Sequence, residues 1–236
     1  EKISEIIPVK EFSDNEYLVM VTKNGIIKKT PASEYESIRK SGKIAITLKE
    51  GDELISIFKT TGNDNIFLAT RNGMAICFNE NDARAVGRTA SGVKAIDLAD
   101  GDYVVGAEPV REDSKVLLVT DGGYGKCTDL TSFRIQHRGG KGLKAYKITE
   151  KTGNIIGISM VNDSEELIMV TSEGVVIRIR IKDIATTTGR ITQGVRLINL
   201  NDGVTVVSMD KISAEDAVEE ESEENNTEVT AETTEE

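Results

Sequence analysis

A unit of about fifty residues recurs four times along the chain. Each copy opens with a short apolar run that ends in Thr-x-x-Gly, and successive threonines are 48, 50 and 51 residues apart, at Thr22, Thr70, Thr120 and Thr171. A fixed period in this range is typical of propellers and related arrays, in which one unit is too small to bury its own core. The repeat therefore predicts a single body built from four units.

Strand signals dominate each unit. Asn24-Gly25 suits a tight hairpin, because asparagine and glycine tolerate positive φ. Alternating segments later in the unit, such as residues 44–48 and 93–98, fit half-buried strands. An acid–glycine turn then precedes a last apolar strand, at residues 54–57 in the first unit. We expect an all-β, propeller-like fold with about four strands per unit and almost no helix.

The two ends of the chain differ from its repeated middle. Residues 1–16 align with the end of a repeat, which predicts a partial N-terminal blade with a strand at residues 6–9. Four complete blades are expected at about 17–63, 64–113, 114–163 and 164–212. This register is what the C-terminal part of a larger array would show.

The net charge of −11 resides in the C-terminal tail. Of the 40 acidic residues, eleven lie in residues 213–236, a segment without lysine or arginine, which leaves 29 acids against 29 bases in the body. A balanced body can still carry a basic face. The tail is nearly free of large apolar side chains, so it is predicted to be disordered.

Composition also limits the cellular setting. No run of 18 apolar residues is present, and no charged-then-apolar leader opens the chain, so we expect neither a membrane span nor export. Cys77 and Cys127 each follow the turn glycine by four residues in adjacent repeats, and we interpret both as buried strand residues. A reducing, cytoplasmic location fits this use of cysteine.

A basic landmark recurs after each turn, as a cation followed by a glycine. The four pairs are Arg39 with Gly42, Arg88 with Gly92, Arg138 with Gly142, and Arg190 with Gly194. Further bases lie beside them, at Lys40, Lys43, Lys94, Lys144 and Arg196. Repetition in register predicts that the bases project from one edge of successive units, where cations and close-approaching glycine backbone suit phosphates. The alternative interpretation is solvated loop charges with glycines that the turns require.

The third landmark is denser than the others. It reads Gln136, His137, Arg138, Gly139, Gly140, Lys141, Gly142, with Lys144 just beyond. Its glycines leave backbone N–H groups accessible to an anion, and its bases supply positive charge, so we expect an anion-binding nest. A Walker loop is absent, because no Gly-x-x-x-x-Gly-Lys-Ser/Thr occurs.

Catalytic constellations are missing from the sequence. His137 is the only histidine, which cannot form a zinc site with two distant buried cysteines, and no Gly-x-Ser-x-Gly is present. Asp52 and Asp102 recur as turn residues. Tryptophan is absent and aromatic residues are few, which argues against a stacking surface for single strands and against WD40 blades. We expect no catalytic residue, no metal site and no cofactor in this chain.

At residues 136–142 the chain resembles the C-terminal domain of bacterial DNA gyrase A, whose box has the form Gln-Arg-Arg-Gly-Gly-Lys/Arg-Gly. The likeness extends over residues 1–212, through segments 24–31, 87–94 and 192–198. His137 stands where that box has arginine. The family has six blades with the principal box in the first, whereas the box-like segment here falls in what would be the fifth.

The resemblance implies a strand-exchanged β-pinwheel whose basic rim binds and bends double-stranded DNA. It further implies partners, namely the catalytic core of gyrase A and the gyrase B protein in an A2B2 heterotetramer, with ATP and Mg²⁺ used elsewhere in that enzyme. The acidic tail resembles tails of the family that modulate wrapping, and our hypothesis is that it competes with DNA for the basic rim. Two alternatives stay open: the equivalent C-terminal domain of topoisomerase IV, and a propeller-like scaffold for protein partners.

Overall fold

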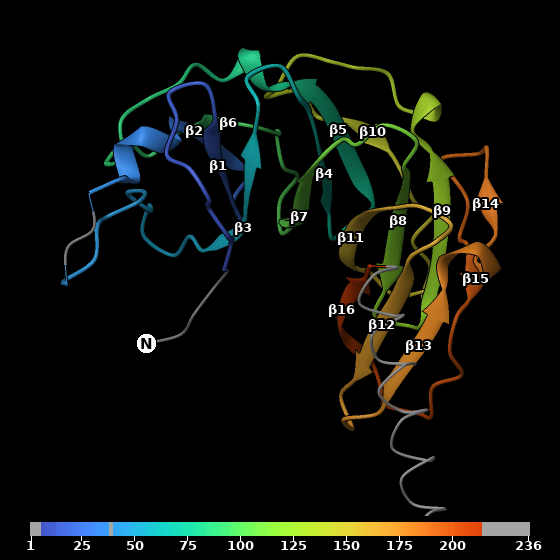
Figure 1. The fold of residues 1–236 in the computed structure, drawn as a ribbon. Helices are drawn as coiled ribbons and strands as arrows, with labels where there is room; N and C mark the ends of the chain where they lie inside the picture. Colours follow the sequence, from blue (N-terminus) through green and yellow to red (C-terminus); the bar gives the residue numbers. More distant parts are fainter. Residues whose placement is uncertain (1–5, 38–39, 214–236) are drawn as a thin grey trace, which may run out of the picture.

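The structure, a computed structural model, describes residues 6–37 and 40–213. Four small, mainly antiparallel sheets stand side by side along an arc, with the first and last sheets at its two ends (Figure 1). In the described part of the chain, the helical elements are four short 3-10 turns: η1 (Ala32–Tyr35), η2 (Glu80–Asp82), η3 (Leu130–Ser132) and η4 (Ile181–Asp183). No helix within these ranges is long and apolar enough to cross a membrane.

Each sheet runs from an inner strand, through a hairpin, to an outer edge. In hydrogen-bonded order, the first two sheets are β3 (Leu54–Thr60), β1 (Tyr17–Thr22), β2 (Ile26–Pro31), β6 (Val93–Lys94); and β7 (Val104–Pro109), β4 (Asn65–Thr70), β5 (Met74–Asn79), β10 (Leu143–Lys144). The last two are β11 (Ile155–Val161), β8 (Lys115–Thr120), β9 (Tyr124–Asp129) with both β14 (Thr186–Thr187) and β15 (Val195–Arg196); and β16 (Val206–Ile212), β12 (Glu166–Thr171), β13 (Val176–Arg180).

The outer strand of each of the first three sheets comes from the following repeat. β6 pairs with β2 through Val93 and Ile27, although the two lie in different fifty-residue units. β10 pairs with β5 and β15 with β9 in the same way. The all-β, propeller-like fold and its strand exchange are therefore confirmed, and a sheet is not the same stretch of chain as a sequence repeat.

Three expected strands differ from the structure. Residues 6–16 form no strand, and Ile6 is 78% exposed, so the strand predicted at 6–9 is wrong. Residues 44–48 are also without strand structure, and of the strand predicted at 93–98 only Val93–Lys94 forms. An exchange strand needs the hairpin of a preceding unit as its partner. Within the described ranges, residues 44–48 have no such hairpin beside them, and Ile44 is 64% exposed.

The Thr-x-x-Gly signature closes every hairpin through two hydrogen bonds. At the first turn the Gly25 N–H donates to the Thr22 carbonyl at 3.0 Å, and the Ile26 N–H donates to Thr22 Oγ1 at 3.2 Å. Gly25 has φ of +77°, a conformation that glycine adopts without a Cβ penalty. Asn24 does not share it, because Asp113 is the one non-glycine residue with positive φ in the described chain. The glycine alone therefore supplies the turn geometry that the sequence suggested for both residues.

The recurring acids cap these turns. Asp102 accepts the Asn72 N–H at 3.0 Å and the Thr70 hydroxyl at 2.7 Å, and Asp52 accepts the Asn24 N–H at 2.9 Å. These hydrogen bonds tie the acid–glycine turn of a unit to the hairpin of that unit. The structural role expected of both aspartates is confirmed.

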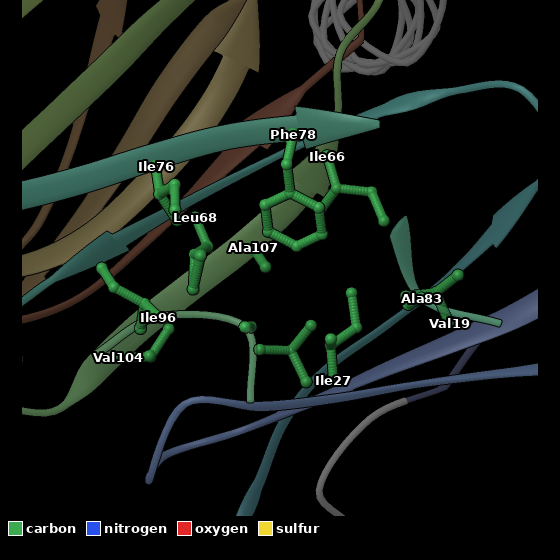
Figure 2. Close-up of a cluster of buried hydrophobic side chains, with 12 residues drawn as sticks. Val19, Ile27, Ile66, Leu68, Ile76, Phe78, Ala83, Ile96, Val104 and Ala107 are labelled. Carbon is green, nitrogen blue, oxygen red and sulfur yellow. The ribbon is translucent and has the colours of Figure 1, made fainter. Parts of the chain in front are cut away.

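The hydrophobic core lies between sheets rather than within one. Figure 2 shows the first of three clusters, where Val19 and Ile27 of the first sheet meet Ile66 and Phe78 of the second. Two further clusters join the second sheet to the third and the third to the fourth. Each unit therefore completes its core only against a neighbour, which is the behaviour predicted from the repeat length.

Both cysteines are buried in these strands, as expected. Cys77 lies in β5 and Cys127 in β9, and both are free thiols. Burial raises the pKa of each thiol to about 11. Because the thiolate is the reactive form, these two cysteines are poorly suited to redox or nucleophilic chemistry.

A buried ion pair links the first two units. Lys29 of β2 lies 3.1 Å from Glu80 of η2, and the two side chains are 5% and 0% exposed. Glu80 also accepts the Thr60 hydroxyl at 2.7 Å and two backbone N–H groups of the 60–64 turn. The carboxylate is thus fully hydrogen-bonded, which a buried charge requires.

Candidate nucleic-acid interface

Three of the four basic landmarks lie on segments that cross from one unit onto the second hairpin strand of the preceding unit. We call residues 84–94, 134–144 and 186–196 the exchange loops. They end in β6, β10 and β15, which pair with the second hairpin strands β2, β5 and β9 (Figure 1). The bases of these three landmarks therefore gather on the outer edges of three consecutive sheets.

The landmark glycines let each exchange loop reach its partner strand. Gly92, Gly142 and Gly194 all have positive φ, and a Cβ on any of them would lie 2.4–2.5 Å from a carbonyl oxygen of β2, β5 or β9. No side chain fits such a contact. These three glycines therefore serve the strand exchange, a role that neither interpretation of the landmark had given them. Gly42, by contrast, has no heavy atom within 4 Å of the position a Cβ would take.

The landmark arginines join neighbouring exchange loops. Arg138 Nη1 donates to the Lys94 carbonyl at 2.9 Å, and Arg190 Nη1 donates to the Lys144 carbonyl at 3.0 Å. Arg88 Nη1 makes the equivalent bond to the Ile44 carbonyl at 2.7 Å. Each acceptor lies two residues after the landmark glycine of the preceding unit. The three half-buried guanidinium groups therefore form a regular series of contacts from one unit to the next.

The bases near the glycines are the exposed members of the set. Lys94, Lys141 and Lys144 are solvent-exposed, and Lys94 forms a 2.7 Å ion pair with Asp97. Arg196 is exposed as well but donates to the Tyr124 hydroxyl at 3.0 and 3.2 Å. These bonds lower the pKa of Tyr124.

The first landmark is only partly described. Arg39 lies outside the described residues. Lys40 is exposed, and Lys43 Nζ donates to the Glu34 carbonyl at 3.3 Å. This segment precedes residues 44–48, which pair with no hairpin in the described chain, so its bases do not share the arrangement of the other three landmarks.

The glycine-rich loop at residues 136–142 is held by an acid. Asp82 Oδ2 accepts the Arg138 N–H at 3.2 Å and lies 3.2 Å from His137 Nδ1, while Arg138 Nε donates to the Asp82 carbonyl at 2.8 Å. The His137 side chain is 97% exposed, and its contact with Asp82 is a polar loop contact. Asp82 was not singled out from the sequence, because an acid in a basic site has no obvious role there.

Not all of this loop is available for an anion. The Gly139 N–H donates to the Ala95 carbonyl at 2.6 Å, and the Gln136 N–H donates to the Cys77 carbonyl at 2.8 Å. Gly140 is exposed, and its carbonyl accepts the Asp97 N–H at 2.9 Å. An anion would therefore meet the exposed stretch from Gly140 to Lys141 rather than a complete nest of N–H groups.

Two further bases extend the surface. Arg84 and Arg134 are exposed, and each precedes its landmark arginine by four residues. Their common register was the signal that could have revealed them. With Lys94, Lys141 and Lys144 they make up what we call the rim bases. No cluster of three or more metal-ligating side chains occurs in the described part of the chain.

Comparison with known proteins identifies the family. The family described as the DNA gyrase C-terminal domain, beta-propeller, matches residues 16–61, 64–111, 114–162 and 165–213. The chain belongs to this family. The DNA gyrase A protein of Halalkalibacterium halodurans is 56% identical over 216 residues, and that of Clostridium acetobutylicum 49% over 217. Each alignment covers 92% of this chain but 26% of the relative, so the chain spans about a quarter of the length of these proteins.

Solved structures share the fold of this gyrase-family domain. The C-terminal domain of DNA topoisomerase IV superposes with a TM-score of 0.84 at 29% identity, covering 94% of this chain and 69% of that one. A DNA gyrase A C-terminal domain gives 0.77 at 26% identity, covering 86% and 68%. The fold is therefore common to both enzymes, whereas the two sequence relatives are gyrase proteins.

The contacts of Asp82 lead to a prediction about the glycine-rich loop. Asp82→Ala removes the acceptor for the Arg138 N–H, so we expect trypsin to cleave after Arg138 and Lys141 roughly tenfold faster, as local opening becomes easier. Mass spectrometry of a short digestion would measure this. Asp183→Ala is the matched control, since Asp183 holds the same position in η4 and pairs with exposed Arg180 at 2.9 Å. Equal cleavage rates in the two variants would contradict the assignment.

Proposed function

We propose that this chain binds and bends double-stranded DNA without strong sequence preference, as a non-catalytic domain of a gyrase A protein. The observation that carries the proposal is the repeated placing of the rim bases on two consecutive exchange loops, with Arg84 and Lys94 on one and Arg134, Lys141 and Lys144 on the next. Arg88, Arg138 and Arg190 join each exchange loop to the preceding unit. An arc of exposed cations at a fixed repeat suits the phosphates of a curved duplex, because such contacts carry little sequence information.

The energetics of bending favour many distributed contacts. Smoothly bending 20–30 base pairs costs on the order of 1–6 kcal/mol. The binding free energy of one cation at one phosphate is too small to offset that cost. Several rim bases, each neutralising one phosphate, can offset it. The interlocked exchange loops keep these bases at fixed separations, so the curvature is set before DNA arrives.

In the holoenzyme, we infer that the bent DNA segment is presented to the strand-passage core with a chosen crossing sign. The gyrase B protein and the catalytic core of gyrase A, as an A2B2 heterotetramer, would then perform ATP-dependent negative supercoiling. ATP and Mg²⁺ act outside this chain, and the parent enzyme works in the bacterial cytoplasm on the nucleoid.

The lysines of the second exchange loop offer a direct test, since Lys141 and Lys144 are both exposed. Replacing the two by alanine should weaken duplex binding and flatten its salt dependence by roughly two phosphate contacts, while the wild-type affinity falls about 10³-fold from 50 to 200 mM salt. Fluorescence anisotropy with a labelled duplex would measure both.

Lys59→Ala with Lys115→Ala is the matched control for this test. It removes the same charge from lysines that pair with Glu16 and Asp163 away from the exchange loops. If both double variants lose affinity equally, the rim bases are not the binding surface. A wild-type affinity that is indifferent to salt would contradict DNA binding through phosphates altogether.

The sign of supercoiling separates gyrase from topoisomerase IV as the parent. The full-length gyrase A protein that carries this chain, assembled with gyrase B and ATP, should convert relaxed plasmid into negatively supercoiled plasmid. Two-dimensional gel electrophoresis would show the sign. Relaxation or decatenation without supercoiling would favour the topoisomerase IV alternative, whose domain has the same fold.

The acidic tail, which apart from Ser213 lies outside the described residues, is proposed to compete with DNA for the rim bases. Deleting residues 214–236 removes eleven acids, so duplex affinity should rise, most strongly at low salt where screening is weak. Titrations of the full-length and shortened chains at two salt concentrations would measure this. An unchanged affinity at both salt concentrations would exclude competition.

A further inference from the structure

Two lysines are buried at the same position of alternate hairpins. Lys28 and Lys126 each lie three residues after the turn glycine, and their exposed fractions are 1% and 0%. Lysine is almost never fully buried unless its ammonium group is satisfied by partners. The second hairpin has Ile76 at this position, also buried at 1%. Apolar side chains therefore fit the site, and the two lysines need an explanation beyond packing.

Both ammonium groups donate to the backbone of an exchange loop. Lys126 Nζ donates to the Arg190 carbonyl at 2.5 Å, to Thr192 Oγ1 at 3.1 Å and to the Gly189 carbonyl at 3.4 Å. Lys28 Nζ donates to the carbonyls of Arg88 and Ala45. In each case one acceptor is the carbonyl of the landmark arginine itself.

The exchange loop that faces Ile76 is secured differently. There Asp82 accepts from the Arg138 N–H and its own carbonyl accepts from Arg138 Nε. In every described exchange loop, a side chain is therefore hydrogen-bonded to the backbone of the landmark arginine. This side chain is a buried lysine for Arg88 and Arg190, and the carboxylate of Asp82 for Arg138.

We propose that Lys28 and Lys126 are positioning residues for DNA, which hold the Arg88 and Arg190 loops in the geometry that the duplex requires. The inference rests on the proposed function. Neither lysine touches DNA, since both are enclosed beneath the loops. They act by fixing carbonyls, so that each guanidinium can bridge to the preceding unit at Ile44 or Lys144.

Three N–H donors are needed to satisfy the three acceptors of Lys126, and only the protonated amine has three. Burial, and then the nearby guanidinium, lower the pKa of each lysine to about 8. The other groups that face Lys28 are Glu34, whose charge favours the ammonium form, and Tyr35, whose hydroxyl donates to the same Ala45 carbonyl. Lys126 lies 5.2 Å from the ring centre of Tyr146.

The sign of the pH effect distinguishes positioning from a purely structural role. Above about pH 8 the amines lose a proton. Lys126 then lacks a donor for one of its three acceptors, and the remaining hydrogen bonds of both lysines weaken because the donor is no longer charged, so DNA affinity should fall. Folding responds in the opposite direction. The folded pKa of about 8 lies below the unfolded value of 10.5, so the unfolded chain binds more protons between these two values and these groups make the fold more stable as pH rises through that window.

The test measures affinity for a labelled duplex of about 30 base pairs, and urea unfolding, from about pH 7 to pH 9.5. It uses the wild-type chain and the Lys28→Met, Lys126→Met double variant. Wild-type affinity should fall roughly tenfold across this range, the worth of one hydrogen bond from a charged group. The double variant should already be roughly tenfold weaker at pH 7 and should show no further step near pH 8, while its fold is as stable as wild type or more so.

Ile76→Met is the matched control, because it places the same side chain at the same position above the loop that Asp82 holds. It should keep both the wild-type affinity and its pH step. The inference is overturned if the lysine variant binds like wild type with the same pH step. It is also overturned if the affinity of the wild-type chain does not change through pH 8, and this second measurement does not depend on whether the variant folds. A wild-type chain that fails to bind duplex at any pH overturns the proposed function as well, whereas salt-dependent binding without the pH step overturns this inference alone.

Discussion

The close crossing of an exchange strand over the hairpin of the preceding unit is the contact on which the structure depends. It requires a glycine with positive φ at a point where a Cβ would lie within 2.5 Å of a carbonyl oxygen. Once that crossing is made, the exchange strand pairs with the second strand of the hairpin, and the exchange loop that precedes it packs against the same hairpin. The landmark arginine then lies close enough to donate to the neighbouring unit. The core follows the same logic, since each cluster lies between two sheets.

The exchange loops also explain how charge is distributed in a body with equal numbers of acids and bases. Acids such as Asp52 and Asp102 are used at the hairpin turns, where they accept backbone N–H groups. Bases are concentrated on the crossing segments. The half-buried arginines donate to protein carbonyls, and the lysines beside them are exposed to solvent. A basic surface therefore forms without any excess of positive charge.

Much of this architecture could be predicted because it depends on residues close together in the sequence. Thr22 and Gly25 indicate a hairpin turn by their residue types, and the recurrence of this pattern gives the repeat of about fifty residues. The exchange could not be derived that way, since β6 and β2 lie in different units and nothing within one unit shows which hairpin Val93 will join. For the same reason Gly142 suggested an approach to phosphate, whereas it approaches the Ala75 carbonyl. The burial of Lys126 could not be predicted either, because the groups that accept its hydrogen bonds lie at residues 189–192, far along the sequence.

The fourth sheet carries three strands in the described chain, while the others have a strand from the next unit on their outer edge. A sheet and a repeat are thus offset by one strand, so a single blade cannot be excised from the chain as a contiguous piece. Blade number can change only by whole repeats, because any other insertion or deletion would separate a crossing glycine from its hairpin. The length of the arc would then vary in discrete steps, with the spacing between successive exchange loops held constant as it lengthens or shortens.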